Sequence, residues 1–203
     1  VDAYVTTIGG KDKLATVKSL DQTYTMEMMG MSLTFREVID NGKLFRSVTG
    51  QGMNLMKEVY DGSAGYSEQM GQRIPTEGKD LEEKKDDVIP FPEMFYNQPG
   101  YTVEVKGAEE INGKVAYKLS VTKPTGAKTI VFFDQDSHLK LKEIHSGTEE
   151  GQTTTIDFAD YKQVDGIMFP HTQTISGPMP QPMVMKAQVI KINTPVDTSL
   201  FKI

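Results

Sequence analysis

Few residues of this chain have the types and spacing that catalysis or metal binding requires. The three histidines, His138, His145 and His171, lack the HExxH spacing and any other short spacing typical of metal sites. Ser63 lies in Asp-Gly-Ser-Ala-Gly, but it follows a hairpin turn, whereas a Gly-x-Ser-x-Gly nucleophile stands between a strand and a helix. Glycine loops of the phosphate-binding and dinucleotide-binding kinds are also missing. The sequence therefore predicts no catalytic residue, no metal site and no cofactor.

Carboxylates are the remaining source of acid or base chemistry. Those that cluster near the middle of the chain alternate with lysines, a pattern typical of a solvated helix face; they are Asp80, Glu82, Glu83, Asp86 and Asp87. A carboxylate buried in a cavity would be different, because burial changes its pKa. Glu27 or Glu37 beside Tyr24 could fill that role, so an enzyme on this scaffold stays an alternative.

Methionine is the residue type that stands out. The chain has 12 methionines and no tryptophan. The methionines form clusters along the sequence, and Met29 and Met179 belong to these clusters. Methionine is flexible and polarizable, so it suits surfaces that accept apolar ligands of varied shape, although core packing is the simpler use for any single one. Met26 and Met28 share strand parity with Tyr24, which indicates one apolar face. The predicted apolar, ligand-binding trough is lined by Tyr24, Met26, Met28, Phe35, Phe45, Met53, Met70, Met94, Phe95, Phe132, Met183 and Met185.

Composition excludes several classes of protein. The 22 basic residues are scattered among 28 acidic ones, which gives a net charge of −6 and argues against phosphate-dominated nucleic-acid binding. The chain has no cysteine, which excludes disulfides, zinc-thiolate sites and thiol nucleophiles. No apolar run approaches the roughly 20 residues that a membrane-spanning helix needs.

The hydrophobic pattern predicts a mainly β protein with a few helices. Residues 1–20 have helical periodicity interrupted at Gly9-Gly10, and from residue 21 the period changes to two. Residues 77–89 are rich in helix formers, and the prolines that follow them predict an irregular segment, so this insertion is expected to form a lid. With strands resuming after Tyr101, we expect about ten or eleven antiparallel strands in one domain that spans residues 1–203.

The segment DYKQVDGIMFPHTQTI, residues 160–175, predicts a hairpin with a tight Asp165-Gly166 turn. Ile167 and Phe169 are expected to face one side of the second strand. Pro170 lacks an N–H donor, which favours an edge or bulged position where the sheet stays open. In the strand before this hairpin, Lys140 is assigned to the exposed face.

Several segments together resemble a known family. They are the N-terminal helix with Gly9-Gly10, the lid insertion, FFDQDSHLKLKEI (132–144), DFADYKQVDGIMFP (157–170) and INTPVDTSLF (192–201). Their order along essentially the whole chain resembles the LolA/LolB-like superfamily of outer-membrane lipoprotein carriers and receptors. None of these motifs is a catalytic signature.

The resemblance implies an unclosed β-barrel whose concave face holds acyl chains beneath a lid of helices. It implies a monomeric, non-enzymatic protein of the periplasm or cell envelope of a Gram-negative bacterium, peripheral to the membrane at most. Its partner would be a lipid or an acylated lipoprotein, with an envelope protein as a second partner. In carriers of the family an internal arginine helps to hold the lid, and Arg36 or Arg46 could take that part here.

A second function stays open beside the carrier. The N-terminal AYVTTIGGKDKLATVKSL also resembles segments near the C-termini of envelope peptidases. The chain would then be a non-catalytic accessory or sensor domain that binds protein partners. The sequence begins at Val1 without methionine, and we expect a signal peptide or a fused upstream region to precede it.

Overall fold

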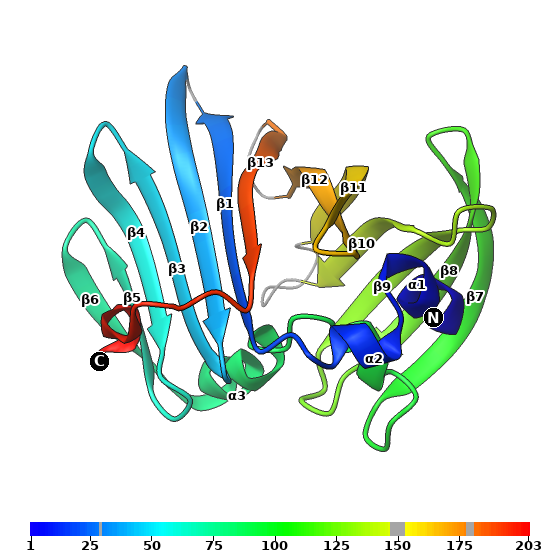
Figure 1. The fold of residues 1–203 in the computed structure, drawn as a ribbon, viewed down its shortest axis with the longest axis horizontal. Helices are drawn as coiled ribbons and strands as arrows, with labels where there is room; N and C mark the ends of the chain where they lie inside the picture. Colours follow the sequence, from blue (N-terminus) through cyan, green and yellow to red (C-terminus); the bar gives the residue numbers. More distant parts are fainter. Residues whose placement is uncertain (29, 147–152, 178–180) are drawn as a thin grey trace. The chain divides into compact units, whose positions relative to one another are not determined.

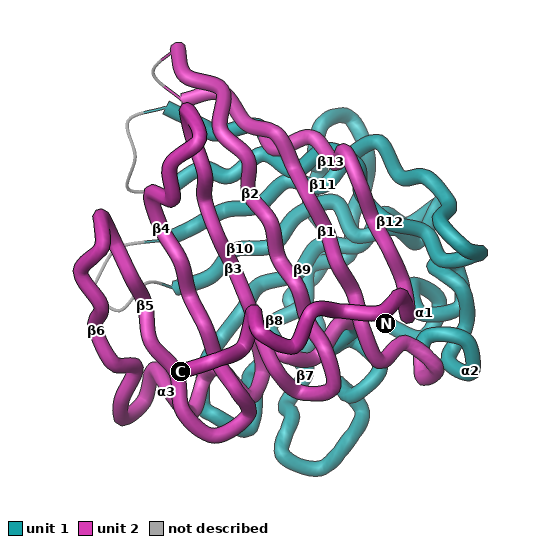
Figure 2. The backbone as a smooth tube through the Cα atoms, turned by 60° about the vertical axis from the view of Figure 1, so that its left-hand side comes forward, with its two compact units in different colours: residues 1–14, 91–184 teal, residues 15–90, 185–203 magenta. Residues whose placement is uncertain are grey.

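The computed structural model describes residues 1–28, 30–146, 153–177 and 181–203, so Met29 and Met179 lie outside the described residues. It confirms the mainly β prediction: thirteen strands form an unclosed antiparallel sheet (Figure 1). The chain divides into two compact units, coloured separately in Figure 2. The first unit contains residues 1–14 and 91–184, and the second contains residues 15–90 and 185–203.

In the second unit the strands follow the order β6-β5-β4-β3-β2-β1-β13. Its elements are β1 (Ser19–Met28), β2 (Met31–Asp40), β3 (Lys43–Gly50), β4 (Met53–Tyr60), β5 (Gly65–Gln69), β6 (Gln72–Thr76), α3 (Gly78–Asp87), β13 (Met183–Ile192, which begins two residues before the unit boundary) and the 3-10 helix η2 (Thr198–Phe201).

In the first unit the order is β12-β11-β10-β9-β8-β7. Its elements are α1 (Asp2–Ile8), α2 (Lys11–Leu14), the 3-10 helix η1 (Pro92–Phe95), β7 (Thr102–Ile111), β8 (Lys114–Thr122), β9 (Lys128–Asp134), β10 (Lys140–Ser146), β11 (Thr153–Val164) and β12 (Ile167–Ser176). The predicted helical break at Gly9-Gly10 is confirmed, because it separates α1 from α2.

Tight two-residue turns set the register of the hairpins. Asn41 and Gly42 have φ angles of 47° and 80°, and Asp165 and Gly166 have 48° and 78°. Positive φ at both positions gives the turn a twist that matches the flanking strands. The first of these turns places Asp40 opposite Lys43 and therefore Glu37 opposite Arg46.

The two faces of the second unit's strands have separate cores. On one face, Val38, Phe45, Val59 and Tyr66 pack with Phe201 of η2. Alternate residues point to the opposite face of a strand, so their sequence neighbours form the second core. There Ile39, Leu44 and Tyr60 pack against Leu81 of α3 and against Val88. We call this second surface the α3 face.

The first unit is also covered on one face. Tyr4 of α1 packs on Phe133 of β9, with 5.0 Å between the ring centroids. Phe91 packs on Phe169 of β12 with a centroid distance of 5.9 Å. We call the surface that carries Phe133 the α1 face.

The expected number of strands was too low, and the edge position expected for Pro170 was wrong. The sheet has thirteen strands, more than the ten or eleven expected, and one of those missed is β6, which includes Pro75; proline is tolerated there since β6 is an end strand of the sheet. Pro170 does not lie in an end strand, because β12 has an interior place in the strand order. It is paired with Tyr161 next to Asp160, whose φ of 56° disturbs β11 at that point.

Gly65 offers a test of this packing. A Cβ atom at residue 65 would lie 2.9 Å from the carbonyl oxygen of Val59, which is part of the β4–β5 pair. We expect Gly65→Ala to lower the free energy of unfolding by about 1–3 kcal/mol, because backbone must move. Urea unfolding measures this, and Gln69→Ala, at an exposed position of the same strand, is the control. Equal stability of the two variants would contradict the packing.

Candidate functional site

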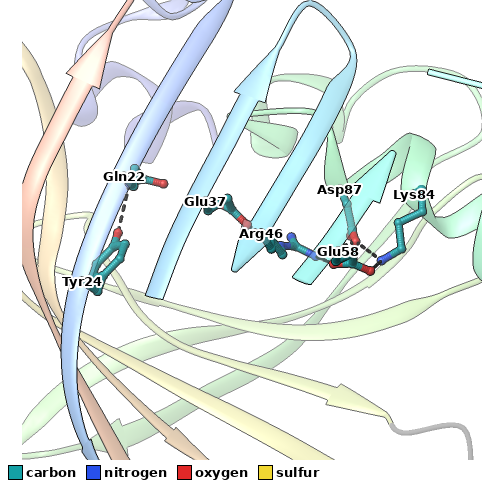
Figure 3. Close-up of polar contacts among 7 residues, drawn as sticks. All are labelled: Gln22, Tyr24, Glu37, Arg46, Glu58, Lys84 and Asp87. Carbon is teal, nitrogen blue, oxygen red and sulfur yellow. Dashed lines mark hydrogen bonds and ion pairs between the residues drawn. The ribbon is translucent and has the colours of Figure 1, made fainter. Parts of the chain in front are cut away.

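A charged cluster on the α3 face joins three strands to α3 (Figure 3). Arg46 Nε donates to Glu37 Oε2 at 2.6 Å, and Arg46 Nη1 donates to Glu58 Oε2 at 3.2 Å and to Asp87 Oδ2 at 3.1 Å. Lys84 Nζ lies 2.7 Å from Glu58 Oε1 and 2.9 Å from Asp87 Oδ2. Arg46 therefore connects β2, β3 and β4 with the last turn of α3.

Strand register explains the cluster. Arg46 stands directly opposite Glu37 on β2 and opposite Glu58 on β4. The first of these pairs follows from the Asn41-Gly42 turn, so the sequence contained a signal for it. Of the two arginines named from the resemblance, Arg46 contacts α3, whereas Arg36 pairs with Asp21 on the opposite face.

The cluster is held by opposite charges in a partly buried setting. The Arg46 side chain is 24% exposed. Burial by itself would lower the pKa of Arg46, but Glu37, Asp87 and Glu58 outweigh it and raise that pKa. Burial by itself would raise the pKa of Asp87, but Arg46 and Lys84 outweigh it and lower that pKa. Each group thus stays charged because its partners are in place.

Apolar residues continue the α3 face beyond the charged cluster. Phe35, Val48 and Met56 are directly opposite one another on β2, β3 and β4. Tyr24 lies opposite Phe35, and its hydroxyl accepts from Gln22 Nε2 at 3.0 Å. Phe35, Val48 and Met56 are half-buried, so part of each apolar side chain is accessible to a ligand.

The structure brings together only some of the predicted trough residues. Met26 and Met185 are paired, buried and on the α3 face with Tyr24 and Phe35, and Met28 and Met183 belong to the same two strands. Phe45 lies on the opposite face, in the core that η2 covers. The remaining members are in neither core of the second unit: Met53 and Met70 are exposed, Met94 and Phe95 belong to η1, and Phe132 packs with Ile111 and Ala116 in the first unit.

A second charged cluster lies within the first unit. Lys140 Nζ donates to Glu93 Oε1 at 2.7 Å and to Glu143 Oε1 at 2.6 Å. It also lies 5.9 Å from the ring centroid of Tyr4 in α1 and 4.7 Å from that of Phe158. Lys140 thereby holds α1 and η1 on the strands of this unit. The alternation of residues along the strand did not predict this role for Lys140.

The expected exposure of Lys140 was wrong, because its side chain is 12% exposed and Glu93 is 3% exposed. A bulge between Lys140 and Lys142 shifts the strand register and changes the face to which the side chain points. Burial by itself would raise the pKa of Glu143, but Lys140 and His145 outweigh burial and lower it to about 2.

The α1 face also has an uncovered apolar part. Tyr117 is paired with Phe133, and Leu119 is paired with Val105, so these side chains share the α1 face. Val105 is 72% exposed and Tyr117 is 48% exposed. A separate cavity of about 380 Å³ in this unit is lined by Ile111, Leu139, Leu141, Phe158 and Tyr161, with Lys114 and Asp160 also in its wall, and none of them was predicted for the trough.

The residues considered for catalysis are occupied otherwise. Glu37 accepts from Arg46, and Glu27 is exposed. Ser63 donates to Asp61 in a turn, and His145 lies 3.2 Å from Glu143 Oε2. Among the described residues, no three His, Asp or Glu side chains are placed to hold a metal ion. In the same part of the chain, no helix has both the length and the apolar composition needed to cross a membrane.

The Arg46 cluster predicts how α3 is held. Arg46→Met would leave Glu37, Glu58 and Asp87 facing one another without the guanidinium. We expect a loss of about 1–3 kcal/mol in the free energy of unfolding, since breaking a buried ion pair costs more than that and this one is partly solvated. Hydrogen exchange of the α3 amides should accelerate. Arg36→Met is the control, and similar exchange in both variants would contradict the assignment.

The lowered pKa of Asp87 predicts acid sensitivity. A carboxyl whose pKa is lower in the folded protein stabilises it fully above its unfolded pKa, about 3.9, and this contribution disappears as the pH falls through the folded value. The stability difference between the native protein and Asp87→Asn should therefore be largest near neutral pH and vanish in acid. Thermal unfolding across pH measures it, and Glu143 titrates equally in both proteins. A difference that grows in acid would contradict this sign.

Comparison with solved structures identifies the fold. The chain is similar to a DUF1329 family protein from Desulfovibrio piger, with a TM-score of 0.65, 13% identity and coverage of 99% of this chain and 95% of that one. For a LolA superfamily protein from Nitrosomonas europaea the TM-score is 0.59, with 11% identity and coverage of 98% and 97%. A domain classed with outer membrane lipoprotein-sorting proteins, from Vibrio parahaemolyticus, has a TM-score of 0.58, 13% identity and coverage of 90% and 88%.

The sequence alone matches no family model and no curated protein. At 11–13% identity the likeness is one of fold. It agrees with the element order described above: N-terminal helices, an antiparallel sheet and a helical insertion halfway along the chain. The chain has a LolA-like fold.

Proposed function

We propose that this protein is a non-enzymatic binding protein of the cell envelope that holds the acyl chains of a lipid or of a lipidated protein. The observation that carries the proposal is the α3 face, where half-buried apolar side chains lie beside a helix fastened by charges. Phe35, Val48 and Met56 supply the apolar surface, and Arg46 with Asp87 supplies the fastening.

Binding of an acyl chain needs little else. Each methylene removed from water contributes about 0.8 kcal/mol, so a row of apolar side chains suffices and no directional chemistry is required. The uncovered part of the α1 face, with Val105 and Tyr117, is a second apolar surface of the same kind. Methionine at positions such as 56 adapts to chains of different shape.

The fastening of α3 is suited to release. The Arg46 cluster is partly open to water, and three carboxylates share two cations within it. Water can replace such contacts at modest cost, whereas an apolar seal would have to expose its surface. In this proposal α3 covers the α3 face when no ligand is bound and moves away when an acyl chain enters.

The fold relatives support the proposed partner and location. One relative is described as an outer membrane lipoprotein-sorting protein domain and another as a LolA superfamily protein. We infer that this chain acts in the periplasm of a Gram-negative cell and that its ligand is a lipid or an acylated lipoprotein. These inferences rest on the likeness of fold together with the apolar face.

Ligand capture tests the proposal directly. The protein is produced in a Gram-negative periplasm, purified without detergent and examined intact by native mass spectrometry. We expect a stoichiometric lipid or acyl species, which is then released and identified. A clean apo mass that persists after incubation with lipid vesicles would refute the carrier function and favour an accessory domain that binds proteins.

A pair of variants locates the site. Phe35→Asn with Met56→Asn should weaken the binding of a fluorescent fatty acid by at least roughly tenfold, because several methylenes lose their apolar contacts. Thr34→Asn with Thr49→Asn places the same side chain at neighbouring paired positions on the opposite face, and it should bind as the native protein does. Equal affinity of both double variants would remove the α3 face from the site.

A further inference from the structure

Three hairpin turns of the second unit carry exposed methionines. Met31 follows Gly30 after β1, Met53 follows Gly52 after β3, and Met70 begins the turn after β5. These residues are 37%, 60% and 92% exposed. We call Met31, Met53 and Met70 the methionine tips.

The antiparallel order brings the methionine tips to one end of the unit. Successive turns of a meander alternate between its two ends, so the turns after β1, β3 and β5 share an end (Figures 1 and 2). Contacts connect them: a Cβ at Gly50 would lie 2.4 Å from Leu33 Cδ2, and the Met70 N–H donates to the carbonyl oxygen of Leu55 at 3.4 Å. The tips therefore form a row at one end of the strands β1 to β6.

The turns at this end of the unit contain no charged residue, and the nearest charges, Glu27, Glu68 and Arg73, belong to the strands, where Glu68 and Arg73 form an ion pair. Residues 28–35, 47–56 and 69–72 contain only apolar residues, glycine, serine, threonine, asparagine and glutamine. The turns at the opposite end are different, because they contain Asp40, Lys43 and Asp61. Asp61 accepts from the backbone N–H groups of Ser63 and Ala64 and forms an ordinary solvated turn. One end is thus polar and charged, and the other is neutral and tipped with methionine.

We propose that the methionine tips dock the second unit on the surface of a lipid bilayer. Charged groups are costly in the hydrocarbon region of a bilayer, and the methionine tips carry none. The three hairpins are closed by the ladder pairs Met28–Met31, Gly50–Met53 and Gln69–Gln72, so shallow insertion leaves few N–H and C=O groups of the strands without partners. Flexible, unbranched methionine side chains fit among disordered acyl chains.

A bilayer accounts for these features better than a protein partner does. The three methionines lie on separate hairpin turns, and Met53 and Met70 are well exposed. They do not form the continuous concave patch that a protein partner would fill. Aromatic and arginine anchors, which are enriched at protein interfaces, are absent from residues 28–31, 50–53 and 69–72, which close the three hairpins; the nearest are Phe35 on the α3 face and Arg73, which stacks on Tyr66. The proposal goes beyond acyl-chain binding, because it concerns where the protein docks and does not require an occupied trough.

Because the chain has no tryptophan, a single introduced tryptophan reports on one position alone. Met70→Trp is mixed with vesicles of phosphatidylethanolamine and phosphatidylglycerol, with and without brominated acyl chains. We expect a blue shift of emission and quenching by the brominated lipid. Ile203→Trp, which replaces a residue that is 53% exposed at the C-terminus, should show neither. Equal quenching at both positions, or none at position 70, would overturn the proposal.

Vesicle sedimentation measures the energetic role of the tips. Met53→Gln with Met70→Gln should lower the vesicle partition coefficient at least tenfold, whereas Val189→Gln with Ile203→Gln should leave it within twofold of the native value. Because the tips are uncharged, binding should not weaken as salt is raised. An unchanged partition coefficient in the tip variant, salt-sensitive binding, or binding only to vesicles that contain an added membrane protein would each overturn bilayer docking. The affinity of the tip variant for a fatty acid is measured separately. Weaker vesicle binding with unchanged fatty-acid affinity assigns the tips to docking, and loss of fatty-acid affinity concerns the carrier function.

Discussion

The ion pairs between the Arg46 guanidinium and three carboxylates are the interaction on which the arrangement of the second unit depends. A cation placed on an otherwise apolar sheet face must be compensated, because an isolated charge there would lose its hydration. Glu37 and Glu58 supply the compensation from the neighbouring strands, and Asp87 supplies it from α3. The same electrostatic requirement therefore orders three strands laterally and determines where the helix lies.

Each unit fastens a covering segment to its strands with buried or partly buried charges, but the two fastenings differ. In the first unit, Lys140 and Glu93 are 12% and 3% exposed and are surrounded by Tyr4 and Phe158. In the second unit, Arg46 is 24% exposed and Asp87 is 30% exposed. Removing a buried partner costs more than hydrating a partly exposed one. We therefore expect α3 to be the more readily released segment and α1 with η1 to stay in place.

A protein that carries acyl chains needs an apolar surface, a cover and a way to move the cover; under the proposed function, the α3 face, α3 and the Arg46 cluster would supply them. The sheet is unclosed, with β6 and β7 as its end strands, as its LolA-like fold implies. The absence of a recognisable catalytic group in the sequence is consistent with this use, because hydrophobic binding is non-directional. Methionine takes two roles in the second unit: Met56 belongs to the α3 face, and Met53 and Met70 form exposed tips.

The sequence by itself determined the strands, their tight turns and the helical insertion, because these depend on local periodicity and on residues such as Asn41-Gly42 that favour positive φ. It also indicated that Tyr24 and Met26 share a face. It could not show that Phe35 and Phe45 lie on opposite faces of the sheet. Both are apolar strand residues, and only the strand register assigns each one to a face. It missed β6, because Pro75 argues against a strand unless the strand is known to lie at the end of the sheet, and it misplaced Lys140, because a bulge shifts the register. Only the tertiary structure decided which charges meet, since Arg46 and Asp87 are far apart in the chain and contact each other only when α3 lies on the sheet.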